Sequence, residues 1–210
     1  MSKRHALVTV SIAVWLTTVV GGLSLLSKYS LLPGVAGSPS STWPIESRLT
    51  RSTDSAHLVM VVHPHCPCSR ASIGELATLM AREQGHLQAS VVFVDPPGFD
   101  GSWAKTDLWA SAGLIPGVTR VIDDGREARL FSAATSGQTM VYDANGRLRF
   151  TGGITVARGH YGDNEGVESI AMILDDTAPS KNAAVAKTPV YGCALFDSVH
   201  ASASKVSCPR

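Results

Sequence analysis

The sequence has few aromatic residues, no excess of either charge and no block of basic side chains. Aromatic residues make up 6% of its 210 residues, and 18 Lys and Arg stand beside 17 Asp and Glu. Because nucleic-acid-binding proteins carry basic patches, this balance argues against a nucleic-acid partner. No Gly-x-Ser-x-Gly motif indicates a serine hydrolase, and no Lys-Ser/Thr follows Gly152-Gly153 to indicate a phosphate-binding loop.

One long apolar run lies near the N-terminus. Residues Ala6 to Leu26 carry no charge, and Lys3-Arg4 precede them. At 1.5 Å per residue, such a helix crosses a bilayer core of about 30 Å. The basic N-terminus predicts a single-pass protein whose remainder lies outside the cytoplasm, with the bacterial periplasm as the expected compartment.

A cleaved signal peptide is the alternative interpretation of this run. The apolar region of a signal peptide is shorter, about 7–15 residues, and a small-residue cleavage site follows it directly. Here the nearest such site, Val35-Ala36-Gly37, lies well beyond the apolar run. An uncleaved membrane anchor is therefore favoured.

The chain divides into four predicted segments. Residues 1–27 form the cytoplasmic N-terminus and the anchor, and residues 28–56, rich in Ser, Pro and Gly, form a linker. Residues 57–175 form the folded domain, and residues 176–210 form a flexible tail that contains two cysteines.

Strand and helix patterns alternate through the domain. Strands are predicted at 57–62, 88–94, 119–122, 138–142 and 147–151, and helices at 69–84, 105–112, 125–133 and 164–174. Asn145-Gly146 indicates a hairpin turn, and Asp163 is the expected cap of the last helix. The prediction is an α/β fold, a mixed central sheet with helices on both faces, preceded by one transmembrane helix.

The most informative motif is His63-Pro-His-Cys-Pro-Cys-Ser-Arg70, between the first strand and the first helix of the domain. Backbone amides and the dipole of a helix N-terminus favour an anion at such a junction. A thiolate is an anion, so a lowered pKa is expected for Cys66 or Cys68. The motif therefore points to thiol redox chemistry.

This pattern resembles the thioredoxin-like superfamily, and within it the membrane-anchored, extracytoplasmic thiol–disulfide oxidoreductases of bacteria, including the type called RedB. The resemblance spans about residues 57–175 and depends on the strand–Cys–helix junction, on Ser69–Leu76, and on Arg126–Phe131 leading into Gln138–Gly146. It implies disulfide exchange with protein thiols, with Cys66 and Cys68 as catalytic residues and no required cofactor.

The sequence departs from that pattern in two ways. Cys66-Pro67-Cys68-Ser69 stands in place of Cys-x-x-Cys. In one register, Cys66 takes the exposed first-cysteine position of that motif and Ser69 takes the second. In the other register, His65 takes the first position and Cys68 the second. The residues that follow, from Arg70 to Leu76, favour the first register. The family's cis-proline falls near Ser136 or Gly137, so a trans loop is expected.

The partner of Cys66 remains open at this point. A Cys66–Cys68 disulfide would close a small, strained and easily reduced ring, and Cys68 could instead be a buried, inert thiol. For Cys193 and Cys208, a structural disulfide with each other is the favoured interpretation. Either one could instead be the resolving thiol for Cys66, delivered by the tail.

Two imidazoles support another class of function. Two roles are expected for His63 and His65. They could stabilise a nearby thiolate, or they could form a copper or zinc site together with Cys66 and Cys68. Rigid Pro67 makes it difficult for both sulfurs to reach one ion. A metal-delivery module and a non-catalytic thioredoxin-like binding domain are therefore the alternatives to a thiol–disulfide oxidoreductase.

Overall fold

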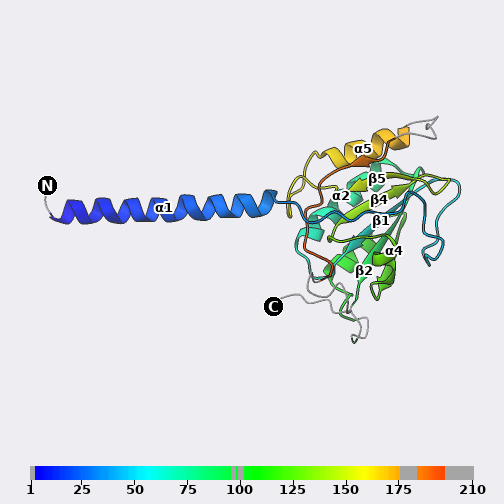
Figure 1. Cartoon of the computed structure of the whole chain (residues 1–210), viewed down its shortest axis with the longest axis horizontal. Helices are drawn as coiled ribbons and strands as arrows, with labels where there is room; N and C mark the ends of the chain where they lie inside the picture. Colours follow the sequence, from blue (N-terminus) through cyan, green and yellow to red (C-terminus); the bar gives the residue numbers. More distant parts are fainter. Residues whose placement is uncertain (1–2, 96–97, 99–101, 176–183, 197–210) are drawn as a thin grey trace. The chain divides into compact units, whose positions relative to one another are not determined.

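The computed structural model describes residues 3–95, 98, 102–175 and 184–196 (Figure 1). It contains two units, an N-terminal helix and a folded domain that begins at Pro33. The elements are α1 (Lys3–Leu31), β1 (Ala56–Val62), α2 (Cys68–Arg82), β2 (Leu87–Val94), α3 (Asp107–Gly113), β3 (Val118–Asp123), α4 (Arg126–Leu130), β4 (Gln138–Tyr142), β5 (Leu148–Gly152), α5 (Glu165–Asp175) and β6 (Ala186–Lys187).

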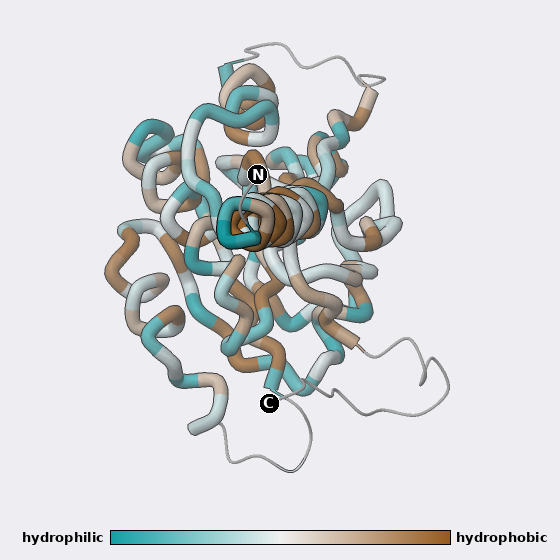
Figure 2. The backbone as a smooth tube through the Cα atoms, turned by 90° about the vertical axis from the view of Figure 1, so that its left-hand side faces the viewer, coloured by the Kyte–Doolittle hydropathy of each residue, from teal (hydrophilic) through white to brown (hydrophobic). Residues whose placement is uncertain are grey.

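Helix α1 is apolar along most of its 29 residues, and none of its side chains is buried. Figure 2 shows apolar residues along its length and hydrophilic residues at its N-terminal end. By length and composition it can cross a membrane. It extends to Leu31, a few residues past the predicted end of the anchor.

The domain is built on one six-stranded sheet with the order β3-β2-β1-β4-β5-β6. Strands β1, β2 and β3 are parallel, whereas β4 is antiparallel to both β1 and β5. The predicted β4–β5 hairpin is present, and its turn residue Gly146 has a φ of +77°. The predicted mixed sheet with helices on both faces is thus confirmed.

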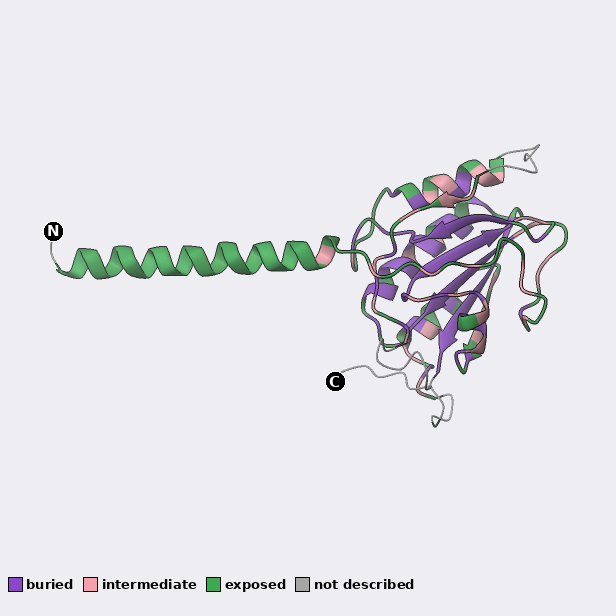
Figure 3. Cartoon of the chain, viewed as in Figure 1, coloured by how far each residue is buried: buried purple, intermediate pink, exposed green. Residues whose placement is uncertain are grey.

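Strand β1 lies in the middle of the sheet and is buried on both faces (Figure 3). Its side chains alternate between two apolar clusters, as the two-residue period of a strand requires. Leu58, Met60 and Val62 pack in the cluster under α2, α3 and α5. Val59 and Val61 pack in the cluster that includes Ala128 of α4. The loop after β1 is therefore held by a strand that cannot shift without exposing both cores.

The segment predicted as a linker, 28–56, packs on the domain from Gly34 onward. Its Trp43 makes edge-on ring contacts with Phe131 and Tyr142 at 5.1 and 5.3 Å between centroids. Its Thr42 forms an antiparallel bridge with Arg147. An indole can bury a large apolar area, so the Trp43 side chain packs this segment on the domain. The Ser, Pro and Gly content of the segment did not predict this packing.

Residues 184–196, predicted to belong to a flexible tail, also pack on the domain. Ala186 and Lys187 form β6 beside β5, and Leu195 is fully buried. A smaller correction concerns α5: its N-terminal cap is Asn164, whose side-chain oxygen accepts from the Val167 amide at 2.9 Å, in place of Asp163.

Candidate functional site

The site begins where β1 ends and α2 starts. Pro67 occupies the N-cap position of α2 with helical backbone angles, and Cys68 is the first residue of the helix. The amide of Ser69 donates to the Cys66 carbonyl at 3.1 Å, and the amide of Cys66 donates to the His63 carbonyl at 3.0 Å. Proline suits a helix start because it has no N–H to leave unpaired. The Cys66 thiol consequently lies beside the N-terminus of α2.

Residues 184–196, called the C-terminal segment below, bring a third cysteine to this junction. Thr135 and Ala194 form an antiparallel bridge. The amide of Ser136 donates to the Cys193 carbonyl at 2.8 Å, and the amide of Leu195 donates to the Ala134 carbonyl at 2.9 Å. These backbone bonds hold Cys193 beside the loop that precedes β4.

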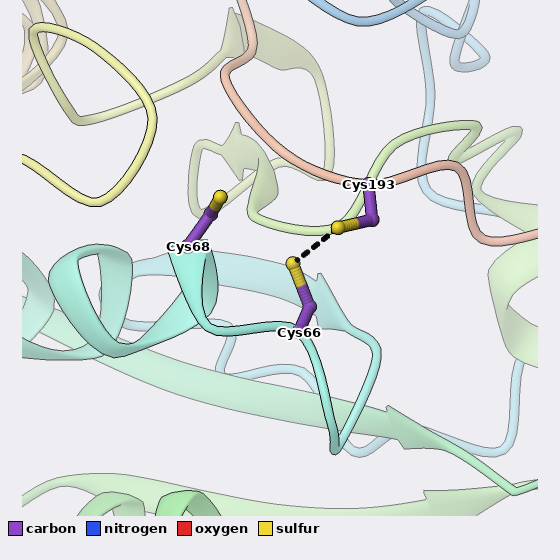
Figure 4. A group of neighbouring side chains, drawn as sticks. All are labelled: Cys66, Cys68 and Cys193. Carbon is purple, nitrogen blue, oxygen red and sulfur yellow. Dashed lines mark hydrogen bonds between the residues drawn. The ribbon is translucent and has the colours of Figure 1, made fainter. Parts of the chain in front are cut away.

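Three sulfur atoms converge at this point (Figure 4). A hydrogen bond joins the Sγ atoms of Cys66 and Cys193, which are 3.0 Å apart. The Sγ atoms of Cys66, Cys68 and Cys193 all lie within 4.8 Å of one another. Cys66 and Cys68 are neighbours in the sequence at the start of α2, whereas the fold brings Cys193 to them from the C-terminal segment.

Cys66 is buried, at 1% exposed, whereas the sequence predicts it in an exposed position. The cause is the C-terminal segment, which lies over it and places the Cys193 sulfur against its own. Cys193 is only partly buried. Cys193 is therefore the less buried residue of this pair. Cys208, predicted as its disulfide partner, lies outside the described residues.

Hydrogen bonding sets the charge of the cluster. The bond with the Cys193 thiol and, next, the interaction with Cys68 hold the pKa of Cys66 far below its usual range, and these outweigh the opposing effect of burial. The same bond raises the pKa of Cys193, because its proton is held by Cys66. Of the two cysteines at the junction, the lowered pKa favours Cys66 as the thiolate, with Cys193 as its hydrogen-bond partner.

Cys68 is also a poor acid here. The Cys193 thiol lowers its pKa, but the hydrogen bond with Cys66 and burial raise it by more. The positive charge of Arg158 opposes that rise, and its guanidinium also donates to the Gly192 carbonyl. The sequence around Arg158 carries no signal of this role, because nothing in its loop shows that the C-terminal segment passes beside it.

A pair of buried serines supports the junction. Ser69 Oγ and Ser136 Oγ are 2.7 Å apart, and Ser136 Oγ also accepts from the His63 amide at 2.7 Å. Ser69, at the position that the resemblance gives to a second cysteine, thus ties α2 to the loop before β4. The described residues contain no cis peptide bond, as the missing proline predicts.

The two histidines lie beside the cluster but outside the group of three sulfurs. His63 Nδ1 accepts from the His65 amide at 3.2 Å, and His65 Nε2 lies 3.0 Å from the Trp103 carbonyl oxygen. Both rings pack on Trp103, with centroids 5.2 and 4.6 Å away. Burial lowers the pKa of His63, against the opposing charge of Cys66, so a neutral imidazole stands near the thiolate.

The chain was compared with known proteins. No protein-family model and no curated protein matches its sequence. Solved structures do match. A hypothetical protein, SMc02350 from Sinorhizobium meliloti 1021, is 19% identical with a TM-score of 0.56, and the match covers 79% of this chain and 94% of that one.

An uncharacterized conserved protein from Geobacillus kaustophilus is 18% identical with a TM-score of 0.53, over 78% of this chain and 91% of that one. A thioredoxin-like protein from Aeropyrum pernix is 10% identical with a TM-score of 0.42, over 77% of this chain and 98% of that one. The likeness concerns the fold, a mixed sheet between helices, and in this chain cysteines lie where β1 meets α2.

Proposed function

We propose that this protein is a thiol–disulfide oxidoreductase whose redox-active pair is Cys66 and Cys193. The observation that supports it most directly is the 3.0 Å separation of their sulfur atoms at the N-terminus of α2. A disulfide bond is about 2.05 Å long, so the sulfurs need to approach by only about 1 Å. Cys68 cannot pair with Cys66 as easily, because Pro67 between them fixes the backbone.

The exchange transfers two electrons between this pair and a partner dithiol. With the pair oxidised, a partner thiolate attacks Cys193 Sγ, forms a mixed disulfide and breaks the Cys66–Cys193 bond, so Cys66 leaves as a thiolate. A second partner thiolate then attacks the partner's own sulfur in the mixed disulfide and releases Cys193, which takes up a proton. The partner gains a disulfide and the pair is reduced. The reverse steps reduce a partner disulfide.

Exposure and acidity favour this order of attack. Cys193 is only partly buried, whereas Cys66 is 1% exposed. The leaving thiol departs faster when its pKa is low, and Cys66 is the more acidic of the two. Cys66 is thus the internal thiolate of the proposed mechanism, and Cys193 is the sulfur that meets the partner.

We further propose that α1 anchors the domain outside the cytoplasm, with the bacterial periplasm as the compartment. Lys3 and Arg4 at the start of α1 favour a cytoplasmic N-terminus. A disulfide between Cys66 and Cys193 can persist in an oxidising compartment and is rare in the cytoplasm. The partners would then be protein thiols and disulfides on the outer side of the membrane.

The test is a disulfide map of the full chain in detergent, equilibrated with reduced and oxidised glutathione. We expect a Cys66–Cys193 disulfide whose fraction follows the glutathione ratio. Cys66→Ser and Cys193→Ser should each abolish it, whereas the matched control Cys208→Ser should retain it. A map showing only Cys193 joined to Cys208, or a pair that does not exchange with glutathione, would overturn the proposal.

A further inference from the structure

Disulfide exchange between Cys66 and Cys193 leaves Cys68 without a role. Cys68 is buried, at 7% exposed, and its Sγ lies within 4.8 Å of both other sulfurs. An inert core thiol would be expected among apolar side chains. Cys68 instead completes a compact group of sulfur donors, the one group of three or more potential metal ligands that the described residues form.

We propose that the reduced forms of Cys66, Cys68 and Cys193 together bind one Cu(I) ion through three sulfur atoms. A metal–sulfur bond of about 2.3 Å places the sulfurs of a planar three-coordinate site about 4.0 Å apart. The Cys66 and Cys193 sulfurs, now 3.0 Å apart, need to separate by only about 1 Å. The remaining pairs already lie within 4.8 Å of one another.

The donor set favours Cu(I) over Zn(II). Soft thiolate sulfur suits both ions, but a structural zinc site takes four ligands in a tetrahedron. The group contains three sulfurs and no imidazole nitrogen. His65 Nε2 lies 3.0 Å from the Trp103 carbonyl oxygen, and His63 Nδ1 accepts from the His65 amide. The buried His63 Nε2 has no hydrogen-bond partner among the described residues, but it is not one of the ligand atoms that lie within 4.8 Å of one another. A three-sulfur site without a fourth ligand is one that Cu(I) can fill.

The surroundings suit the charge of such a site. Three thiolates and one Cu(I) ion carry two net negative charges. Arg158 supplies a positive charge that acts on Cys68, and its guanidinium is held by the Gly192 carbonyl next to Cys193. On binding copper, Cys68 and Cys193 give up their protons to solvent, whereas Cys66 is already a thiolate. Copper stays Cu(I) throughout, so no electron is transferred.

Copper binding and disulfide formation then exclude each other. A Cys66–Cys193 disulfide removes two of the three thiolates, so only the reduced chain can bind the ion. The copper site does not depend on the proposed exchange reaction, although it uses two of the same residues. Cys68 separates the two proposals experimentally, because copper binding requires it and the disulfide does not.

The experiment is an anaerobic titration of the reduced full chain in detergent with Cu(I), in competition with a chromogenic Cu(I) chelator. We expect one ion per chain, and X-ray absorption should show three sulfur neighbours. Cys68→Ser should weaken binding about tenfold or more while still forming the Cys66–Cys193 disulfide on oxidation, which shows that the variant folds. Cys208→Ser is the matched control and should bind as the unaltered chain does.

Three results would overturn the copper site. They are no uptake by the reduced chain, equal affinity in Cys68→Ser and the unaltered chain, and displacement of Cu(I) by an equal concentration of Zn(II). None of them affects the disulfide map, so the proposed function can survive the loss of this inference. Conversely, a chain that binds copper through three sulfurs but never exchanges with glutathione would retain this inference and lose the proposed function.

Discussion

The backbone of Gly192 lies against the carbonyl oxygen of Ser136 so closely that a Cβ atom on Gly192 would be 1.9 Å from that oxygen. The next residue, Cys193, accepts a hydrogen bond from the Ser136 amide through its own carbonyl. This close backbone approach, together with the backbone bonds to Ala134 and Ser136, sets where Cys193 lies. Glycine is required at this position because a Cβ atom would not fit beside the Ser136 carbonyl, and not because the backbone is left-handed.

Gly192→Ala should therefore separate Cys193 from Cys66. The contact is with backbone, which cannot rotate away as a side chain can, so the C-terminal segment has to shift. We expect Cys66–Cys193 disulfide formation to slow about tenfold or more, since small displacements of reacting groups are costly. Thiol trapping after timed oxidation measures the rate. Ala194→Ser, an exposed position on the same segment, is the control and should oxidise normally.

Glutathione should attack the oxidised pair at Cys193. Cys193 is the less buried residue of the pair, and Cys66 is the better leaving thiolate. Brief reaction of the oxidised chain with reduced glutathione, followed by acid quenching and peptide mass mapping, should place glutathione on Cys193. Glutathione found mainly on Cys66 would contradict the proposed order of attack, although not the identity of the pair.

Reduction should destabilise the domain strongly. Cys66 and Cys193 are 127 positions apart, and by loop-closure entropy a disulfide closing so long a loop contributes up to about 5 kcal/mol. Denaturant unfolding of the full chain with and without dithiothreitol measures the difference. In Cys193→Ser, the reductant should change nothing. A similar loss of stability in that variant would mean that another disulfide is responsible.

The orientation of α1 should depend on its first residues. Lys3 and Arg4 provide its N-terminal positive charge, and positive charge is retained in the cytoplasm. A C-terminal fusion to a phosphatase that is active only outside the cytoplasm should be active. Reversing both charges, with Lys3→Glu and Arg4→Glu, should lower that activity per fused chain. A fusion that is inactive with the native N-terminus would contradict the proposed location.

The sheet could be predicted from the sequence because its signals are local. Strand β1 is a run of apolar, β-branched residues between a polar segment and a proline, and the β4–β5 hairpin carries an Asn-Gly turn. The position of Cys66 at a helix start follows from the same local pattern. The prediction therefore identified Cys66 and left Cys193 as one of two possible resolving thiols.

Cys193 was harder to assign because its partner is set by tertiary contacts. The apolar run around it, Val190 to Phe196, is short and is interrupted by Gly192. It is held by backbone bonds to Ala134 and Ser136 that no side-chain pattern shows. The sequence did contain one signal, since Tyr191-Gly192-Cys193 indicates a turn. Two other placements likewise depend on contacts between distant parts of the chain. They are the burial of Leu195 and the packing of Trp43 on Phe131.

The stability of the reduced chain should rise with pH between about 6.5 and 8.5. An unfolded cysteine has a pKa of about 8.5, whereas that of Cys66 in the folded chain is lowered. In this range the unfolded chain therefore binds more protons at this residue, and stability grows by up to about 1.4 kcal/mol per pH unit. Cys193 has the opposite shift, so its contribution is lost only above about pH 8.5. Denaturant unfolding under reductant at several pH values should show this rise in the unaltered chain and a flatter profile in Cys66→Ser. Equal slopes in the two proteins would mean that Cys66 is not the thiolate of the cluster.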